Sequence, residues 1–365
     1  MNYQLYQYSL CSAIALMLFF CLYFFFAKTP EKEIFNNYLR SRRTMGVALL
    51  ALSANYSVHL FCGIRFININ AAILMNLSTY FLCYWLFSSA LTSLLDRSYI
   101  TPRRLRTHIC LWIIFSTLSG TVLFLLPKGM IQNIGLLTMA VWLITYGIIL
   151  ARRLILTYKR AVQTLDETHS DDVAVYVHWM SVFTYWAAIF GVGCGLLTFL
   201  PDEYIYIWIL SSIPFYIYLF YSYLNYLLFY EQIERTLEDG KETSSTDETI
   251  PEKDIPQYYE HIARNLENWI KMETYTQSGF TINDMAKALG TNRTYLSAYI
   301  KERYNLSFRD WVANLRIEYA KQMLKEHPDM NIKQISEASG FLSVSHFIKT
   351  FTEKEGYTPA KWRKQ

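Results

Sequence analysis

Charged residues are scarce in this chain of 365 residues, at 18% against 53% apolar and 17% aromatic residues. A composition so poor in charge and so rich in aromatic side chains excludes an intrinsically disordered or collagen-like chain. The scarcity is uneven, because residues 1–230 hold only 15 of the 34 Lys and Arg and 9 of the 30 Asp and Glu. The two parts of the chain therefore have to be interpreted separately.

Cysteine motifs and catalytic signatures are also missing. The six cysteines lie in or beside apolar stretches and include no C-x-x-C pair, which favours apolar packing over a metal site or a disulfide. The sequence shows no cluster of metal ligands, no nucleophile set and no phosphate-binding glycine loop. We therefore expect no metal, no cofactor and no enzymatic activity.

Seven stretches of the first 230 residues contain no Asp, Glu, Lys or Arg and are close to the roughly 20 residues that cross a bilayer as a helix. The alternative for the first stretch is a cleaved signal peptide, but no Lys or Arg precedes it and its apolar run is longer than a signal h-region. We therefore predict seven transmembrane helices. They are Leu5–Ala27, Gly46–Ile64, Ala71–Leu95, Ile109–Leu126, Ile131–Leu150, Trp179–Leu200 and Tyr206–Phe229.

The basic residues of the connecting loops predict the orientation of these helices, because Lys and Arg near helix ends stay preferentially in the cytoplasm. Thirteen lie in the first, third and fifth loops, whereas the opposite set of segments carries only Arg65 and Lys128. This split places the N-terminus outside and the C-terminus in the cytoplasm. The thirteen are Lys28, Lys32, Arg40, Arg42, Arg43, Arg97, Arg103, Arg104, Arg106, Arg152, Arg153, Lys159 and Arg160.

One predicted transmembrane helix carries an ionisable side chain, His59, with Asn55 one turn before it. Such residues often mark proton or ligand pathways in membrane proteins. Two interpretations stay open. His59 and Asn55 either form hydrogen bonds between packed helices or line a small-molecule pocket that senses a ligand.

The segment from Glu231 to Ile255 holds nine acidic residues, three basic ones and no aromatic side chain. This composition is typical of a solvated tether. Apolar residues still recur at spacings of three and four from Leu227 to Leu237, so the seventh helix continues into the segment. That stripe is either a path for a signal or a fraying helix end. The predicted domains are a transmembrane domain over residues 1–230, an acidic linker over 231–256 and a C-terminal domain over 257–365.

The last third of the chain contains an internal repeat. Each copy has the pattern of a short amphipathic helix, a glycine-containing turn and a second helix. That is the plan of a helix-turn-helix motif, whose second helix reads the major groove of DNA. The repeated pairs, fifty or fifty-one positions apart, are Ile282 and Ile332, Met285 and Ile335, Ala288 and Ala338, Gly290 and Gly340, Leu296 and Phe347, Ile300 and Phe351, and Trp311 and Trp362.

Capping residues mark the helix starts in both copies. Thr281 and Asn292 cap the two helices of the first copy, and Ser343 caps the second helix of the second copy, which begins at Asn331. Between the copies, a helix predicted over Phe308–His327 would be about 30 Å long. One turn of B-DNA is about 34 Å, so this helix can hold two reading helices in successive major grooves.

The C-terminal domain resembles the DNA-binding domain of the AraC/XylS family of bacterial transcription regulators. The resemblance lies in GTNRTYLSAYIKERYNLSFRDWVANLRIEYAKQML and IKQISEASGFLSVSHFIKTFTEKEGYTPAKWRK. It covers about Phe280 to Lys364, with Tyr258–Met272 as a preceding helix, and leaves the transmembrane half unexplained. It implies an all-α domain with two reading helices that often works in pairs on double-stranded DNA.

The resemblance also implies which residues face DNA. Of the base-facing positions, only Lys349 has the long cationic side chain suited to guanine edges. Four further basic residues are predicted to contact phosphates, with a solvated helix face as the alternative for each. The base-facing set is Thr294, Ser297, Ala298, Val344, Ser345 and Lys349, and the phosphate set is Arg293, Lys301, Lys333 and Lys354.

These patterns predict an all-α, membrane-anchored one-component transcription regulator of the bacterial cytoplasmic (inner) membrane. A signal at the seven helices would change the pairing or presentation of the cytoplasmic DNA-binding domain, and proteolytic release in the linker is a variant. The expected partners are double-stranded DNA, membrane lipid, a second copy of the chain in a homodimer on DNA, and RNA polymerase. The alternative function is a transporter or channel-like membrane protein with a regulatory DNA-binding appendage, although the helices lack charge and a two-half repeat.

Overall fold

The chain forms two compact units, each discontinuous in sequence. The computed structural model describes residues 3–197, 204–245 and 255–364, so residues 246–254 of the predicted linker lie outside the described part. The helical bundle unit comprises Met1–Arg160 and Tyr176–Glu231. The C-terminal unit comprises Ala161–Val175 and Gln232–Gln365. The C-terminal unit therefore includes a segment from the predicted fifth loop between transmembrane helices.

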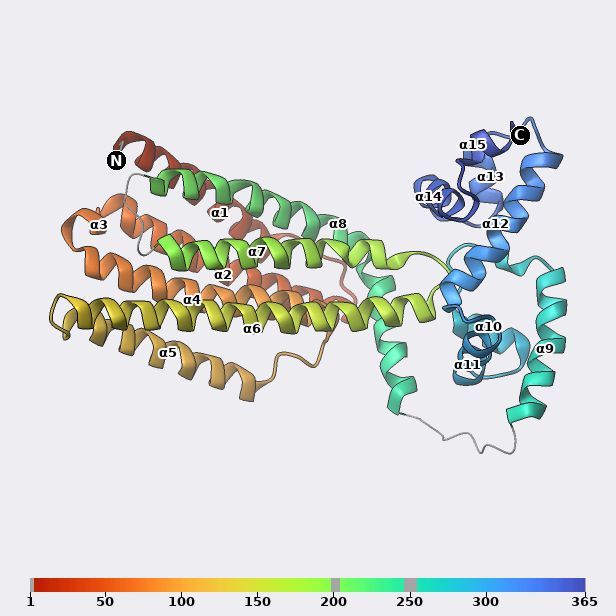
Figure 1. Ribbon diagram of the computed structural model, residues 1–365, viewed down its shortest axis with the longest axis horizontal. Coiled ribbons are helices and arrows are strands. Elements are labelled where there is room, and N and C mark those ends of the chain that lie inside the picture. Colours follow the sequence, from red (N-terminus) through yellow and green to blue (C-terminus); the bar gives the residue numbers. More distant parts are fainter. Residues whose placement is uncertain (1–2, 198–203, 246–254, 365) are drawn as a thin grey trace. The chain divides into compact units, whose positions relative to one another are not determined.

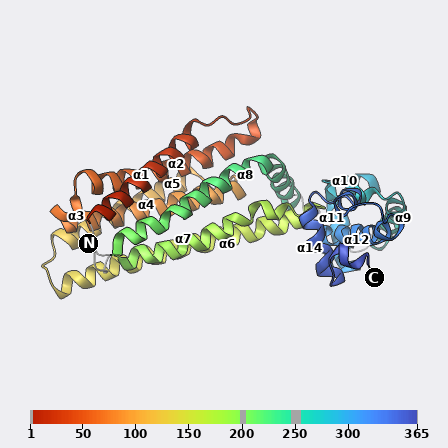
Figure 2. The ribbon, with the colours of Figure 1, turned by 90° about the horizontal axis from the view of Figure 1, so that it is seen from above.

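The helical bundle unit contains the long apolar helices that the sequence predicts. Within the described residues, seven helices are long and apolar enough to cross a membrane. They run side by side along the bundle (Figures 1 and 2), and a short helix, α3 (Ile64–Ile67), joins two of them. The seven are α1 (Tyr3–Phe26), α2 (Asn36–Phe61), α4 (Ile69–Leu95), α5 (Pro102–Phe124), α6 (Met130–Thr168), α7 (His178–Leu197) and α8 (Ile205–Ser245).

Two of these helices are longer than the apolar stretches that predicted them. α6 continues past Leu150 to Thr168, and α8 continues past Phe229 to Ser245. The extensions contain polar residues, so each apolar stretch ends before them. The helix itself continues, because Arg, Lys, Gln and Glu are good helix formers. The first part of the predicted acidic linker is therefore helical.

Aromatic stacking and hydrogen-bonded polar groups hold the bundle together. Phe81 on α4 stacks on Phe115 of α5 and on Tyr146 of α6, with ring centroids 4.5 and 4.1 Å apart. On α2, the buried Ser41 hydroxyl lies 2.9 Å from the Tyr223 hydroxyl of α8. Hydrogen bonds of this kind satisfy polar side chains between helices that have no water to bind.

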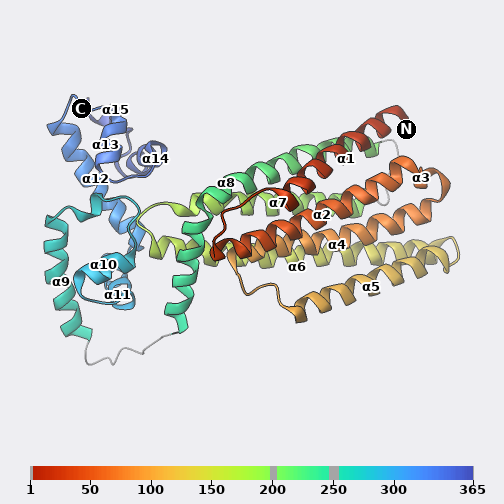
Figure 3. The ribbon, with the colours of Figure 1, turned by 180° about the vertical axis from the view of Figure 1, so that it is seen from behind.

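Two hydrophobic clusters form the core of the C-terminal unit, one for each helix-turn-helix motif. The helix α12 (Phe308–Glu326) contributes Trp311 to the first cluster and Leu324 to the second. In Figures 1 and 3, α10 and α11 lie toward one end of α12, and α13, α14 and α15 toward the other. The other helices are α9 (Ile255–Lys271), α10 (Ile282–Leu289), α11 (Arg293–Tyr304), α13 (Ile332–Ala338), α14 (Val344–Glu355) and α15 (Pro359–Trp362).

The predicted caps and connecting helix are confirmed. Thr281 and Asn331 each form a capping box, and Asn292 and Ser343 accept hydrogen bonds from the first turns of α11 and α14. α12 has 19 residues, about 28 Å at 1.5 Å per residue. The second helices of the two motifs, α11 and α14, therefore each begin after a capping residue, and α12 connects the two motifs.

Gly340 marks a close approach between the two halves of the C-terminal unit. Its φ of +82° lies in the left-handed region, and a Cβ added there would meet the backbone carbonyl of Thr276. Thr276 lies in the first half, at the end of a single 3₁₀ turn that follows α9. Gly356 has a similar φ of +77°, but nothing lies within 4 Å of an added Cβ.

Gly340→Ala is expected to destabilise the C-terminal unit by roughly 3 kcal/mol or more, because both the backbone conformation and the neighbouring carbonyl oppose a side chain. Gly356→Ala is the matched control and should cost about 1–2 kcal/mol, from the backbone conformation alone. Hydrogen exchange of the α13 and α14 amides in the full-length protein measures both losses. Equal losses would contradict the close approach at Gly340.

Candidate nucleic-acid interface

The two reading helices bury one face and leave the other for contacts. α11 buries Leu296, Tyr299 and Ile300, and α14 buries Phe347 and Phe351. In a helix-turn-helix motif, the N-terminal part of the second helix approaches the base edges. The N-terminal turns of α11 and α14 are therefore the parts of this unit that matter most for DNA.

The predicted base-facing residues occupy one face of each reading helix. Ser345 and Lys349 are exposed on α14, and Val344 is half-buried. The Lys349 ammonium lies 4.0 Å from the carboxylate of Glu353, one turn further along. On α11 the corresponding set, Thr294, Ser297 and Ala298, is half-buried throughout. Their role in reading DNA stays a prediction.

The predicted phosphate contacts divide into three exposed lysines and one engaged arginine. Lys301, Lys333 and Lys354 are exposed, and Lys333 lies 3.9 Å from Glu337 on its own helix. Arg293 is half-buried, and its Nη2 donates a hydrogen bond of 2.9 Å to the hydroxyl of Thr168. Thr168 is the last residue of α6, so a residue predicted to bind phosphate contacts the predicted fifth loop instead.

A buried ion pair joins the same loop to α12. The side chains of Arg316 and Asp171 are each only 1% exposed, with 2.7 Å between Nη1 and the carboxylate. The Arg316 guanidinium also donates to the backbone carbonyls of Tyr275 and Gln277. Burial lowers the pKa of Arg316 and Asp171 opposes this, but arginine keeps its proton because its ordinary pKa lies above 12. The pair is therefore a full salt bridge without access to water.

Two further groups of the C-terminal unit face the loop. Arg309, near the start of α12, lies 2.7 Å from the Asp166 carboxylate and 3.2 Å from that of Asp172. On α14, Nε2 of His346 lies 3.6 Å from Asp172. Burial lowers the pKa of His346, against the opposing attraction of Asp172. His346 is therefore neutral near pH 7, and Arg309 provides the stronger contact.

A polar recess of about 530 Å³ lies beside these contacts, within the same unit. Gln232, Arg235 and Thr236 of α8 line one side, and residues of α10 and α11 line the other. Arg293 and Lys287 are among the latter. The N-terminal end of α11 thus faces α8 as well as the loop.

Sequence reasoning missed Arg309, Arg316, His346 and the acidic segment that they contact. One signal was available on α12, where Val312, Arg316 and Ala320 recur every four residues along a buried face. A charged residue within such a stripe needs a buried partner of opposite charge. Nothing in the sequence points to Asp171 as that partner, because the two residues lie 145 positions apart.

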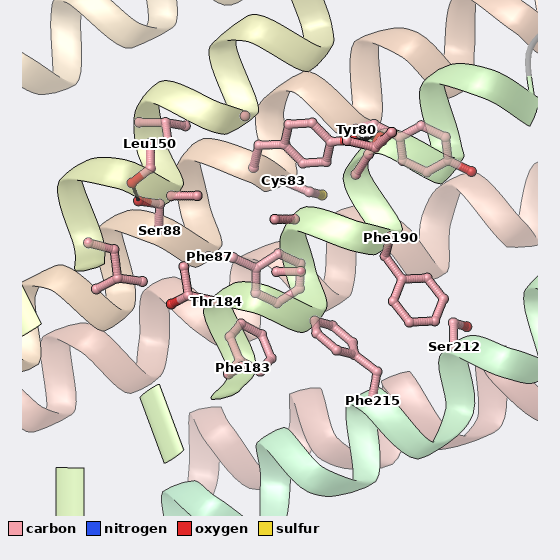
Figure 4. A pocket seen from close by; sticks show the side chains of 18 of the residues that line it. Tyr80, Cys83, Phe87, Ser88, Leu150, Phe183, Thr184, Phe190, Ser212 and Phe215 are labelled. Atoms are coloured by element: carbon pink, nitrogen blue, oxygen red, sulfur yellow. Dashed lines mark hydrogen bonds between the residues drawn. The ribbon is translucent and has the colours of Figure 1, made fainter. Parts of the chain in front are cut away.

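The helical bundle unit contains a cavity of about 120 Å³, shown in Figure 4. Aliphatic and aromatic side chains line most of it, and Phe183 of α7 stacks on Phe215 of α8 with centroids 4.4 Å apart. Two of its hydroxyls, those of Thr184 and Ser212, donate 2.6 Å hydrogen bonds to carbonyls of their own helices. The cavity therefore offers mostly apolar surface to an occupant.

The predicted ligand-sensing residues do not line this cavity. Nε2 of His59 lies 2.9 Å from the Asn76 side-chain oxygen, and Nδ1 lies 3.3 Å from the Tyr6 hydroxyl. Asn55 donates to the Met75 carbonyl over 3.4 Å. His59 and Asn55 thus connect α1, α2 and α4 by hydrogen bonds, the first of the two interpretations left open by the sequence. A role in sensing a ligand stays a prediction.

Comparison with known proteins identifies the class of the C-terminal domain. Residues 285–365 match the helix-turn-helix domain family, so this region is a helix-turn-helix DNA-binding domain. It is of the AraC type, and the resemblance found in the sequence is confirmed for this part of the chain.

The similar regulators match less than a third of this chain, and the chain covers less than two thirds of their own length. The HTH-type transcriptional regulator YtdP of Bacillus subtilis is 34% identical over 107 residues, which are 29% of this chain and 14% of YtdP. The Msm operon regulatory protein of Streptococcus mutans is 32% identical over 100 residues, 27% of this chain and 36% of that protein. ExsA of Pseudomonas aeruginosa is 30% identical over 92 residues, 25% of this chain and 33% of ExsA. No solved structure matches the chain.

Arg316→Met is expected to destabilise the C-terminal unit by about 3–5 kcal/mol, because it leaves the Asp171 carboxylate buried without its cation. Lys325→Met removes an exposed charge from the same helix and should cost less than about 1 kcal/mol. Hydrogen exchange of the α12 amides in the full-length protein measures both. A loss for Arg316→Met no greater than that for Lys325→Met would show that the ion pair is not buried in solution.

Proposed function

We propose that this chain is a membrane-anchored one-component transcription regulator, which binds promoter DNA under the control of its helical bundle. The observation that carries the proposal is the presence in one chain of an AraC-type helix-turn-helix domain and of seven helices long and apolar enough to cross a membrane. The similar proteins are named as transcriptional regulators, which supports this role. The proposal gives the chain no catalytic activity.

The proposed orientation has the N-terminus outside and the DNA-binding domain in the cytoplasm. It rests on the thirteen basic residues of the first, third and fifth loops against two in the opposite set. The segments that make up the C-terminal unit support one part of this orientation, namely that the fifth loop and the DNA-binding domain share one side. Residues 161–175 of the fifth loop belong to the same compact unit as the DNA-binding helices, so both must lie on the same side of the membrane.

The proposed control passes from the bundle to the DNA-binding domain along the chain. The apolar cavity is lined by residues of α6, α7 and α8, among them Leu154, Phe183 and Phe215. The ends of α6 and α8 continue into the C-terminal unit. A change of packing at the cavity, caused by an apolar ligand or by lipid, therefore has a covalent route to the helix-turn-helix motifs.

Double-stranded DNA is the proposed main partner, with a second copy of the chain beside the first on DNA. Residues 257–365 hold 16 basic and 12 acidic residues, a modest excess for a nucleic-acid binder. Pairing of two copies, or tethering at the membrane, would add to the affinity of one domain. RNA polymerase and membrane lipid complete the proposed set of partners.

The proposed orientation predicts which cysteines a membrane-impermeant maleimide reaches in spheroplasts. A chain that keeps only Cys62, which is exposed at the end of α2, should be labelled without permeabilisation, since this end lies outside. The control lacks every native cysteine and carries the substitution Lys361→Cys in the C-terminal unit as its single cysteine. It should be labelled only after permeabilisation, and the reverse pattern would overturn the orientation.

The proposed DNA binding predicts different losses for two lysines in matched settings, each near a glutamate four residues on. Lys349→Ala should cost about 1–3 kcal/mol of binding and relax sequence preference at one base pair, because it removes a base contact. Lys333→Ala should weaken binding evenly across sequences and lower the salt slope by about 1.

The measurement starts from genome-wide mapping of DNA bound by the full-length protein, which supplies the target duplex. Titrations of that duplex at several salt concentrations then compare the two variants with the unaltered protein. Absence of any enriched promoter site would reject the proposed function. Identical effects of the two substitutions would reject the predicted division between base and phosphate contacts.

A further inference from the structure

The segment Asp166–Asp172 contacts the DNA-binding helices at several separate places. Asp171 pairs with Arg316 on α12, and Asp166 and Asp172 pair with Arg309 at its start. Backbone bonding adds to these pairs, because the Ser170 amide donates to the Phe280 carbonyl over 3.2 Å. The Gly279 amide donates in turn to the Asp171 carboxylate over 2.6 Å. The segment is therefore bound in a defined register, with both backbone and side chains engaged.

These contacts sit where the two helix-turn-helix motifs meet. The Arg316 guanidinium lies 5.6 Å from the centre of the Phe280 ring, which packs on the first cluster. It lies 5.8 Å from that of Phe341, which belongs to the second cluster. Asp171 thus binds a side chain that lies beside an aromatic ring of each half of the unit. A segment held there influences both reading helices together.

The same segment uses groups at the ends of the reading helices that approach DNA. Thr168 accepts a hydrogen bond from Arg293, the first residue of α11. Asp172 faces His346, the third residue of α14. The Asp172 carboxylate therefore lies close to the N-terminal turn of α14, which would approach a phosphate backbone. Like charges at such short range repel, and a phosphate and Thr168 cannot both take the same Arg293 donor.

We propose that the segment Asp166–Asp172 is an intramolecular competitor of DNA, which occupies the surface formed by Arg293, Arg309, Arg316 and His346. This inference rests on the proposed function and specifies its regulation. With the segment bound, the DNA-binding domain is held in a state of low affinity. The segment comprises the last residues of α6 and those before the 3₁₀ turn Val173–Val177, which precedes α7, so a rearrangement of these two helices withdraws it. Withdrawal breaks the hydrogen bond from Arg293 to Thr168 and the ion pairs of Arg309 with Asp166 and Asp172, and removes these carboxylates from the interface.

The test uses the full-length protein in lipid nanodiscs and a labelled 30-base-pair duplex of mixed sequence at low salt, which reports phosphate binding without a known target. Asp172→Asn keeps the shape of the side chain but removes the charge that faces Arg309 and His346. It should bind the duplex about three- to fivefold more tightly than the unaltered protein, and with Asp166→Asn about tenfold.

Glu167→Gln is the matched control. It removes one negative charge from the same segment, but the Glu167 carboxylate accepts a hydrogen bond from Gln163 on its own helix and should change binding little. Equal affinities for Asp172→Asn and Glu167→Gln would overturn the inference while leaving the proposed function intact. Weaker binding by Asp172→Asn would also overturn it and would indicate that the segment organises the reading helices for DNA. Failure of every version to bind would overturn the proposed function and the inference with it.

Hydrogen exchange provides a second measurement that needs no substitution. Peptides covering residues 166–172 should exchange slowly in the unaltered protein, since the Ser170 amide is hydrogen-bonded to Phe280. Saturation with the duplex should speed their exchange at least severalfold, because DNA displaces the segment. Unchanged exchange in the DNA-bound protein would overturn the competition directly.

Discussion

Arg316 carries a positive charge into the centre of the C-terminal unit, and that charge needs a carboxylate beside it. An isolated buried cation is costly, so its neighbours must replace the water that it has lost. Backbone carbonyls of Tyr275 and Gln277 replace part of that water, and the Asp171 carboxylate supplies the opposite charge. The partner is not part of the helix-turn-helix repeat but lies far upstream, between two apolar helices. The C-terminal unit therefore includes a loop that joins two helices of the bundle.

This arrangement gives the helical bundle a direct route to control the DNA-binding unit. In a regulator with a separate sensor domain, a signal has to cross a domain interface or a linker. Here the loop between α6 and α7 already belongs to the unit that would read DNA. Its carboxylates pair with Arg309 and Arg316, and its Thr168 accepts a hydrogen bond from Arg293, the arginine predicted to contact phosphate. A small displacement of α6 or α7 therefore acts on a surface where a carboxylate and a phosphate compete, and such electrostatic competition is strong at short range and sensitive to salt.

The parts of the fold that were predicted correctly depend on local patterns. Runs without charge predicted seven long apolar helices, because a helix in lipid needs apolar side chains along its whole membrane-spanning length. The spacing of Ile282 and Ile332, with caps at Thr281 and Ser343, predicted the two motifs, since capping and amphipathic periodicity act within a few residues. The predicted end of α6 was less accurate, because hydropathy detects the apolar stretch and not the helix that continues past it. The continuation of α8 was predicted from the spacing of Leu227 to Leu237.

The sequence by itself determined that the chain is all-α, that it has seven long apolar helices and that it ends in a double helix-turn-helix domain. Only the tertiary structure decided which charged residues form ion pairs. The sequence predicted that Arg293 contacts phosphate. It assigned no role to Asp166, Asp171 and Asp172. Their pairing spans more than a hundred positions, and ion pairs leave no periodic trace in a sequence because either partner could lie anywhere along the chain. Only the folded structure brings the segment Asp166–Asp172 into contact with the arginines of the DNA-binding helices.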